Sequence, residues 1–455
     1  MAPSLQARRK SRRVHQRRIK TQHRNMAVDI LYNVPLVWEE ANSKLPHAED
    51  TNRQLWCKHV GRALDMLLYN AGYSPDSHSQ SLEFFARVVA PSMGVFPVTV
   101  DGSAKSSWDS FMTDDGCPIE LSWDWGTSDR EPTIRYSIEP IGPHAGTYLD
   151  PNNSLAGSVF QNNLNQVLPQ MNLEWFYYFR DFFDDRRGIE FDEDKKGHKS
   201  SIFYAFDLAD NSEITAKVYF FPKYRARARG QSNLQVIEQG ILDAPGSTPE
   251  SLQALSTFSE FCNEPSNKNL EHEMLAIDLI DTSESRFKIY FRCRETSFDS
   301  VVNVMTLGGR VKHPKIGEGL EKLHELWKAL FGASLPPSQP LKENSHRTAG
   351  ILYNVEFRLG DSFPVAKVYL PVRHYSISDN AVIGALDNYF QAHQRGSYMG
   401  AYSNVMNSLF NPESLSAQAG VQTYVGCAIR PNGDLRVVSY FKPPLAEPHS
   451  SAERY

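Results

Sequence analysis

The stretch Arg286-Phe-Lys-Ile-Tyr-Phe291 alternates polar and apolar side chains, the pattern of a β-strand with two different faces. Arg286, Lys288 and Tyr290 share one face, and the three apolar side chains between them share the other. A strand normally turns its apolar face toward the core and its polar face toward water. On its own, this stretch is therefore most simply a surface strand.

The same combination of cation and tyrosine recurs at intervals of roughly 70 to 80 residues. It is found in Lys217-Val-Tyr219, in Lys367-Val-Tyr369 and, with the tyrosine alone, in Val438-Ser-Tyr440. This recurrence indicates one enclosed surface lined by cations and phenols, and not several unrelated faces in water. Such a surface suits an anionic ligand that also has an apolar part.

Five pairs of strand-like segments alternate with helical segments along the chain. The pairs are 119–125 with 133–139, 201–208 with 216–221, 274–280 with 286–293, 351–357 with 366–370, and 422–429 with 436–441. Helical spacing of apolar residues predicts helices within 53–71, 81–89, 158–185, 250–262, 318–331 and 380–410. Ten antiparallel strands with helices on one face close most simply into an α+β barrel with helices outside and a solvent-filled lumen.

Composition narrows the class of protein. Hydrophobic residues make up 41% of the 455 residues, enough for a large core, and no apolar run is long enough to span a membrane. The start lacks the apolar segment of a secretory signal. Five scattered cysteines without a CxxC pair favour reduced thiols and a cytoplasmic protein. The fourteen histidines show no ligand spacing, so we assign none of them to a metal.

Residues 1–25 form a basic arm with nine Lys and Arg residues and no acid. Removing these nine charges from the net charge of −5 leaves −14 for the remaining chain, which argues against nucleic acid as the main partner. We expect a disordered tail or an upstream start codon, since Met26 could initiate. The predicted organisation is this arm, a single barrel domain over 26–445, and a tail over 446–455.

The chemistry of the predicted lumen follows from its cations. Arg135, in Ile134-Arg-Tyr136, adds a further cation to the same wall. These side chains would repel each other and lose hydration unless an anion neutralised them. A diphosphate meets that need through charge-assisted hydrogen bonds, without a metal. The predicted diphosphate ligands are Arg135, Lys217, Arg286, Lys288 and Lys367.

The tyrosines lie one layer from those cations in this interpretation. Aromatic faces stabilise a carbocation and exclude water, which suits the ionisation of an allylic diphosphate. The predicted shield consists of Tyr219, Tyr290, Tyr369, Tyr424 and Tyr440. Glu120, in Pro118-Ile-Glu-Leu-Ser122, shares a strand face with Ser122 and could accept a hydrogen bond from an aromatic co-substrate. The alternative for Glu120 is an ordinary surface or ion-paired glutamate.

Taken in order from about Trp56 to Pro443, these motifs resemble the fungal dimethylallyltryptophan synthase family of aromatic prenyltransferases. The resemblance implies an αββα (ABBA) barrel and metal-independent transfer of a dimethylallyl group from dimethylallyl diphosphate to an aromatic acceptor. It also implies Glu120 as the catalytic residue, with the cations and tyrosines above as diphosphate ligands and shield. Two departures from the family pattern are Lys367, where many members have glutamine, and the interval from Tyr424 to Tyr440.

Two classes of aromatic acceptor fit the sequence. The run Glu120-Leu-Ser-Trp-Asp-Trp125 resembles members that act on fused phenolic polyketides such as xanthones and anthracenones, and an indole or tryptophan-derived acceptor is the alternative. We expect electrophilic aromatic substitution, in which attack by a ring carbon is followed by proton loss, with attack by oxygen or nitrogen as the alternative. A monomer and a homodimer both stay open. We expect no membrane partner. A non-enzymatic carrier of an amphipathic anion would share the cations and tyrosines but would not need Glu120. A metal-dependent terpene synthase would need a second aspartate cluster besides Asp181-Phe-Phe-Asp-Asp185.

Overall fold

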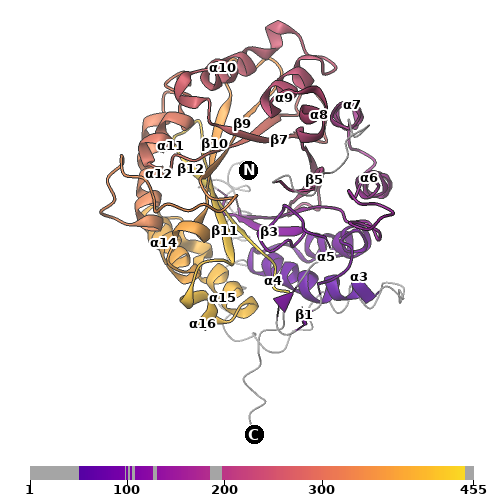
Figure 1. The fold of residues 1–455 in the computed structure, drawn as a ribbon. Helices are drawn as coiled ribbons and strands as arrows, with labels where there is room; N and C mark the ends of the chain where they lie inside the picture. Colours follow the sequence, from indigo (N-terminus) through magenta and orange to yellow (C-terminus); the bar gives the residue numbers. More distant parts are fainter. Residues whose placement is uncertain are drawn as a thin grey trace, which may run out of the picture. The chain divides into compact units, whose positions relative to one another are not determined.

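Ten antiparallel strands close into a barrel in the computed structural model, with the helices placed around the outside (Figure 1). The structure describes residues 51–97, 99–100, 103–104, 108–126, 131–184 and 197–445, with only the backbone of 99–100 and 103–104. The chain divides into units 1–46 and 47–455, of which the first lies outside the described residues. The predicted arm 1–25 and tail 446–455 also lie outside them, so the proposed domain limits stay predictions.

Each barrel strand pairs with its neighbours in the sequence, and the last strand pairs with the first to close the barrel. The ten strands are β3 (Ile119–Asp124), β4 (Thr133–Ile138), β5 (Ile202–Leu208), β6 (Ile214–Phe220), β7 (Glu271–Asp278), β8 (Phe287–Cys293), β9 (Ile351–Phe357), β10 (Val365–Leu370), β11 (Gln422–Ile429) and β12 (Leu435–Phe441). The predicted ten-stranded antiparallel barrel is confirmed, with strand limits that differ from the prediction by a few residues at most. A separate hairpin joins β1 (Thr99–Val100) and β2 (Ser103–Ala104).

The helices of the first half begin with α3 (Thr51–Trp56), the π-helical turn η1 (Cys57–Gly61) and α4 (Arg62–Asn70), which together form the helix predicted over 53–71. Then follow α5 (Pro75–Phe84), η2 (Phe85–Val89), η3 (Ala90–Ser92), α6 (Ala156–Val167), α7 (Glu174–Phe183), α8 (Lys223–Arg229) and α9 (Asn233–Leu242). The prediction did not include α8, because its alternating Arg and Ala residues give no apolar stripe.

The helices of the second half complete the outer layer. They are η4 (Pro249–Leu252), α10 (Gln253–Cys262), η5 (Pro265–Asn267), α11 (Phe298–Met305), α12 (Ile316–Phe331), α13 (Val372–Tyr375), α14 (Asp379–Ala392), η6 (Gly396–Tyr398), α15 (Met399–Leu409) and α16 (Pro412–Ala417). The segments predicted over 158–185 and 380–410 each contain two helices separated by a break. Within the described residues, no helix combines the length and the apolar character needed to cross a membrane.

The main core lies between the strands and the outer helices. Phe287 of β8 stacks on Trp175 of α7 with ring centroids 4.3 Å apart, and Phe291 packs on Phe258 of α10 at 5.3 Å. Phe287, Ile289 and Phe291 are fully buried. Burial of each such side chain stabilises the fold by roughly 1.5–3 kcal/mol. The apolar face of the repeating strand therefore points outward into the helical layer, and its polar face is left for the lumen.

We predict that Gly319→Ala destabilises the protein by about 1–3 kcal/mol, because α12 packs too closely on β11 for a side chain there. A Cβ at Gly319 would lie 2.3 Å from Cγ2 of Ile429. Gly317 is on the same helix, and a Cβ there would meet nothing within 4 Å. Denaturation midpoints should fall for Gly319→Ala and stay level or rise for the control Gly317→Ala. Equal midpoints in the two variants would contradict this packing.

Candidate active site

One level of the barrel carries a charged belt of lumen-facing side chains. Strand pairing places its members side by side, with Arg135 opposite Asp207 and Lys217 opposite Asp278. Among the described residues, the charged belt contains six cations and four carboxylates, a surplus of two positive charges. The cations are Arg135, Lys217, Arg286, Lys288, Lys367 and Arg436, and the carboxylates are Asp124, Asp207, Asp278 and Glu356.

The first half of the charged belt is built around Asp124 and Asp207. Arg135 bridges them, with Nη2 2.7 Å from Asp124 Oδ2 and Nε 3.2 Å from Asp207 Oδ1. Lys217 Nζ lies 2.5 Å from Asp207 Oδ1. Arg436 donates through Nε to Asp124 Oδ2 at 3.0 Å. Asp124, which is fully buried, therefore accepts hydrogen bonds from two guanidinium groups.

The second half of the charged belt repeats this arrangement. Asp278 accepts from Lys288 at 2.5 Å and from Arg286 at 2.8 Å. Glu356 lies 2.6 Å from Lys367 and 3.2 Å from Arg286. Arg286 thus bridges two carboxylates, as Arg135 does in the other half.

These ion pairs correct one sequence-based expectation. The five predicted cations do come together, but they are not bare groups that need an anion to fold, because carboxylates from neighbouring strands pair with them. Burial alone would raise the pKa of Asp207, yet Arg135 and Lys217 outweigh it and hold that pKa well below its usual range. Burial lowers the pKa of Lys217 to about 8 and that of Lys367 to about 7, against the opposing effect of their carboxylate partners.

A tyrosine layer lies next to the charged belt. Tyr219, Tyr290, Tyr369 and Tyr440 form a row, with successive ring centroids 5.6, 5.9 and 5.7 Å apart. Burial raises the pKa of Tyr219 and Tyr369 well above the usual value, so these phenols are neutral. Four of the five predicted tyrosine positions therefore meet on one level of the lumen.

Small residues on neighbouring strands make room for these rings. Tyr219 pairs with Ala276 and Tyr369 pairs with Gly426. A Cβ at Gly426 would lie 3.0 Å from Tyr440 and 3.3 Å from Tyr369. The glycine therefore allows two rings to converge where any side chain would push them apart.

Strand β11 pairs regularly with β12 from Tyr424, opposite Tyr440, to Ile429, and its β-bulge lies just before Tyr424. The register shifts between Gln422 and Tyr424, so Gln422 pairs with Phe441 while Tyr424 pairs with Tyr440. The additional residue, Thr423, bonds to Glu120. Tyr424 lies in the lumen as predicted, at 6.4 Å from Tyr369.

Glu120 faces the lumen beyond the tyrosine layer. Its Oε1 accepts a 2.6 Å hydrogen bond from the hydroxyl of Thr423. Burial raises the pKa of Glu120 to about 7, whereas this hydrogen bond and the nearby Arg373 act to lower it. A carboxyl group with a pKa near neutrality can both accept and release a proton at physiological pH, as a general base requires.

Glu120 and the tyrosines line a chamber of about 730 Å³, which includes its opening to solvent. Its walls are apolar on several sides, formed by Phe111, Met112, Phe203, Met274 and Leu352. Two arginines also line it, and neither was predicted from the sequence. Arg292 donates to Glu273 at 3.2 Å, and Arg373 lies over the ring of Tyr424 and donates to its hydroxyl at 2.9 Å.

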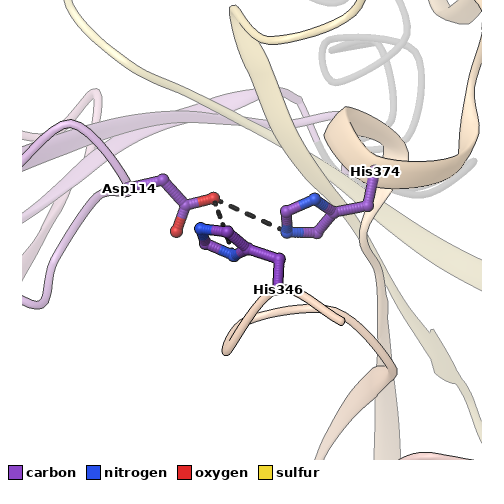
Figure 2. Close-up of side chains that lie close together, drawn as sticks. All are labelled: Asp114, His346 and His374. Carbon is purple, nitrogen blue, oxygen red and sulfur yellow. Dashed lines mark ion pairs between the residues drawn. The ribbon is translucent and has the colours of Figure 1, made fainter. Parts of the chain in front are cut away.

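A polar mouth cluster lies where this chamber meets solvent: Asp114, His346, Thr348, Arg373 and His374. Figure 2 shows Asp114 facing both imidazoles, with its Oδ2 3.5 Å from His374 and 3.9 Å from His346. Arg373 Nε lies 3.0 Å from the same oxygen. Thr348 and Arg373 also line the chamber. The sequence assigned no role to these histidines, because their separation in the chain hides their proximity.

Comparisons with known proteins agree with this architecture. Residues 52–405 match the family described as tryptophan dimethylallyltransferase. The 4-O-dimethylallyl-L-tyrosine synthase of Claviceps purpurea is 37% identical over 402 residues, covering 86% of this chain and 88% of the relative. Xanthone prenyltransferase A of Emericella nidulans is 30% identical over 430 residues, covering 88% and 94%.

The fold has close counterparts among solved structures. The crystal structure of AnaPT from Neosartorya fischeri superimposes with a TM-score of 0.77 at 25% sequence identity, covering 91% of this chain and all of that one. The family match spans most of the chain, and the predicted resemblance is confirmed. This chain belongs to the tryptophan dimethylallyltransferase family of aromatic prenyltransferases, enzymes that use dimethylallyl diphosphate as co-substrate without a metal.

Proposed function

We propose that the chain transfers the dimethylallyl group to the side chain of a free aromatic amino acid, with the phenol of tyrosine as the first candidate. The observation that carries the catalytic part of this proposal is the position of Glu120. Its carboxylate faces an apolar chamber, one layer away from the tyrosines and two from the charged belt. An aromatic ring in the chamber would thus have a base on one side and the prenyl donor on the other.

The charged belt would hold the diphosphate. Its surplus of two positive charges is reached with every carboxylate ionised, so a diphosphate with about three negative charges brings the belt close to neutrality. The cations can turn from their carboxylate partners to the phosphate oxygens without being exposed to water. Added negative charge would also raise the lowered pKa values of Lys217 and Lys367 and keep both protonated.

The reaction begins when the bond between the allylic carbon and the diphosphate oxygen breaks. The diphosphate leaves with the electron pair, and the charged belt stabilises it. The rings of Tyr219, Tyr290, Tyr369, Tyr424 and Tyr440 would surround the allyl cation and keep water away. The phenol oxygen of the acceptor then forms the new carbon–oxygen bond, and its proton passes to Glu120.

The mouth of the chamber favours an amino acid over a neutral polycyclic acceptor. Arg373 and Arg292 offer cations for a carboxylate, while Asp114 and Glu273 offer carboxylates for an ammonium group. Both signs of charge therefore border an apolar space that suits a single aromatic side chain. The 37% identity to a tyrosine-prenylating relative points in the same direction.

A second candidate is a fused phenolic polyketide, as the run from Glu120 to Trp125 suggests. The similarity to xanthone prenyltransferase A favours it. Such an acceptor would use Glu120 and the tyrosine layer in the same way but would make no use of the charges of the mouth cluster. An indole acceptor such as tryptophan would use both the chamber and the mouth.

Incubation with dimethylallyl diphosphate and EDTA tests the proposal, with tyrosine, tryptophan and a hydroxyxanthone as separate acceptors. We expect tyrosine to gain one dimethylallyl unit by mass. An O-linked product would lose the ultraviolet shift that a free phenol shows near its pKa of about 10. N-acetyltyrosine methyl ester, which lacks both charges, should react poorly. Product from the xanthone alone would favour the second candidate, and no product from any acceptor would argue for a carrier.

Glu120 and Thr423 should control the acidic limb of the pH profile. Glu120→Gln should lower kcat by about 10²–10⁴-fold, because the ring loses its base. In the wild type, kcat/KM should rise with pH through about 7, as Glu120 deprotonates. Thr423→Val removes a hydrogen bond that stabilises the ionised form of Glu120. The pKa on the acidic side of the kcat/KM profile should therefore rise by about half to one pH unit. Thr257→Val on α10 is the control. If the pKa on the acidic side of the profile does not change in Thr423→Val, that pKa belongs to another group.

Arg436 provides a test of the charged belt, because it was not among the predicted diphosphate ligands and only the structure places it there. Arg436→Gln should raise the KM for dimethylallyl diphosphate and weaken calorimetric binding of inorganic diphosphate, each by about ten- to hundredfold. The KM for the acceptor should change little. Arg358→Gln, which removes a surface pair with Glu284, is the control. Unchanged diphosphate binding in Arg436→Gln would exclude this residue from the donor site.

A further inference from the structure

We propose that Asp114, His346 and His374 of the mouth cluster bind a divalent transition metal such as Zn²⁺, and that the bound metal closes the chamber to the acceptor. The three residues come from separate parts of the chain: the segment before β3, the segment before β9, and α13. Two imidazoles and one carboxylate form a donor set that zinc and similar ions prefer.

The distances fit tetrahedral coordination. Bonds of about 2.0–2.1 Å to zinc place two tetrahedral ligand atoms about 3.3 Å apart. Asp114 Oδ2 lies 3.5 Å from His374 Nε2 and 3.9 Å from His346 Nδ1. All three ligand atoms lie within 4.8 Å of one another. The three ligand atoms would have to approach one another by at most about 1.5 Å to reach the tetrahedral separation.

Thr348 shows that the site is rich in acceptor atoms. Its hydroxyl lies 2.8 Å from His374 Nε2, 2.9 Å from His346 Nδ1 and 2.9 Å from Asp114 Oδ1. The hydroxyl has one proton, so it can donate to only one of these three atoms. The backbone N–H of Thr348 donates to His346 Nδ1, which therefore carries a lone pair. Three candidate ligand side chains therefore converge around one hydroxyl oxygen, and a metal would replace the hydrogen bonds that they make there.

Arg373 is the opposing group. Its Nε lies 3.0 Å from Asp114 Oδ2, the oxygen closest to both imidazoles. A metal on that oxygen would compete with Arg373 and repel it, so the site should bind more weakly than a structural zinc site. The same competition couples the metal to the chamber, because Arg373 lines the chamber wall and binds the hydroxyl of Tyr424.

The consequence for catalysis rests on the proposed function. A bound metal would take Asp114 away from an acceptor ammonium group and displace Arg373, and it would link three segments across the opening. We therefore expect Zn²⁺ to inhibit competitively with the acceptor. The affinity of the charged belt for free diphosphate should stay the same once the Zn²⁺–diphosphate complex that forms in solution is accounted for.

Binding is tested first and without turnover, by titrating the chelator-treated full chain with Co²⁺ and recording visible absorption. Tetrahedral Co²⁺ should give bands that Zn²⁺ abolishes. The bands should disappear in His346→Ala, whose side chain is 43% exposed and should not be needed for folding. His393→Ala is the matched control, since His393 lies 2.7 Å from Glu325 but belongs to no group of three ligands.

Arg373→Gln should bind Co²⁺ more tightly than the wild type, because the competing cation is gone. Bands that are absent in the wild type, or that persist unchanged in His346→Ala, would overturn the site. Inhibition by Zn²⁺ is then measured relative to the metal-free rate of each variant. Binding without acceptor-competitive inhibition would overturn only the coupling to the chamber, and the Co²⁺ result stands whichever acceptor the enzyme uses.

Discussion

Pairing of opposite charges inside the lumen is the constraint on which the rest of the structure depends. Six cations in one ring of a protein interior would cost far more hydration than the surrounding core could offset. Four carboxylates make the ring possible, and Arg135 and Arg286 each join two of them. Because the carboxylates are fewer than the cations, the barrel can fold without its ligand and still attract an anion.

The alternation of strand residues turns this ring into a layered site. A step of two residues along β6 leads from Lys217 to Tyr219. The same step on β8 and β10 leads from Lys288 to Tyr290 and from Lys367 to Tyr369. Since every strand is hydrogen-bonded to its neighbours, the charged belt and the tyrosine layer are held at a fixed separation. The spacing between the charged belt and the tyrosine rings is thus a property of the barrel backbone and not of any single side chain.

The sequence was sufficient for the barrel, because a two-residue period in ten segments leaves little freedom once one face must be buried. The same period contains more information than the prediction used. Asp207 is two residues from Ala205, Glu356 is two residues from Asn354, and Arg436 is four residues from Tyr440, so each shares the lumen face of its strand. Asp124 similarly follows Glu120 and Ser122 on β3. Reading both strands of each hairpin would have revealed the carboxylates that neutralise the cations.

The residues around Glu120 and the mouth cluster could not be predicted from strand alternation, because they do not follow a two-residue period. Thr423 reaches Glu120 only through a β-bulge, which breaks the alternation at that point. Asp114, His346 and Arg373 lie in connections whose meeting depends on the closed barrel. The charged belt, the tyrosine layer and Glu120 therefore lie on the strands, and the mouth cluster lies in the connections. Changes in the connections can alter the mouth while the strands keep the charged belt, the tyrosine layer and Glu120 in register.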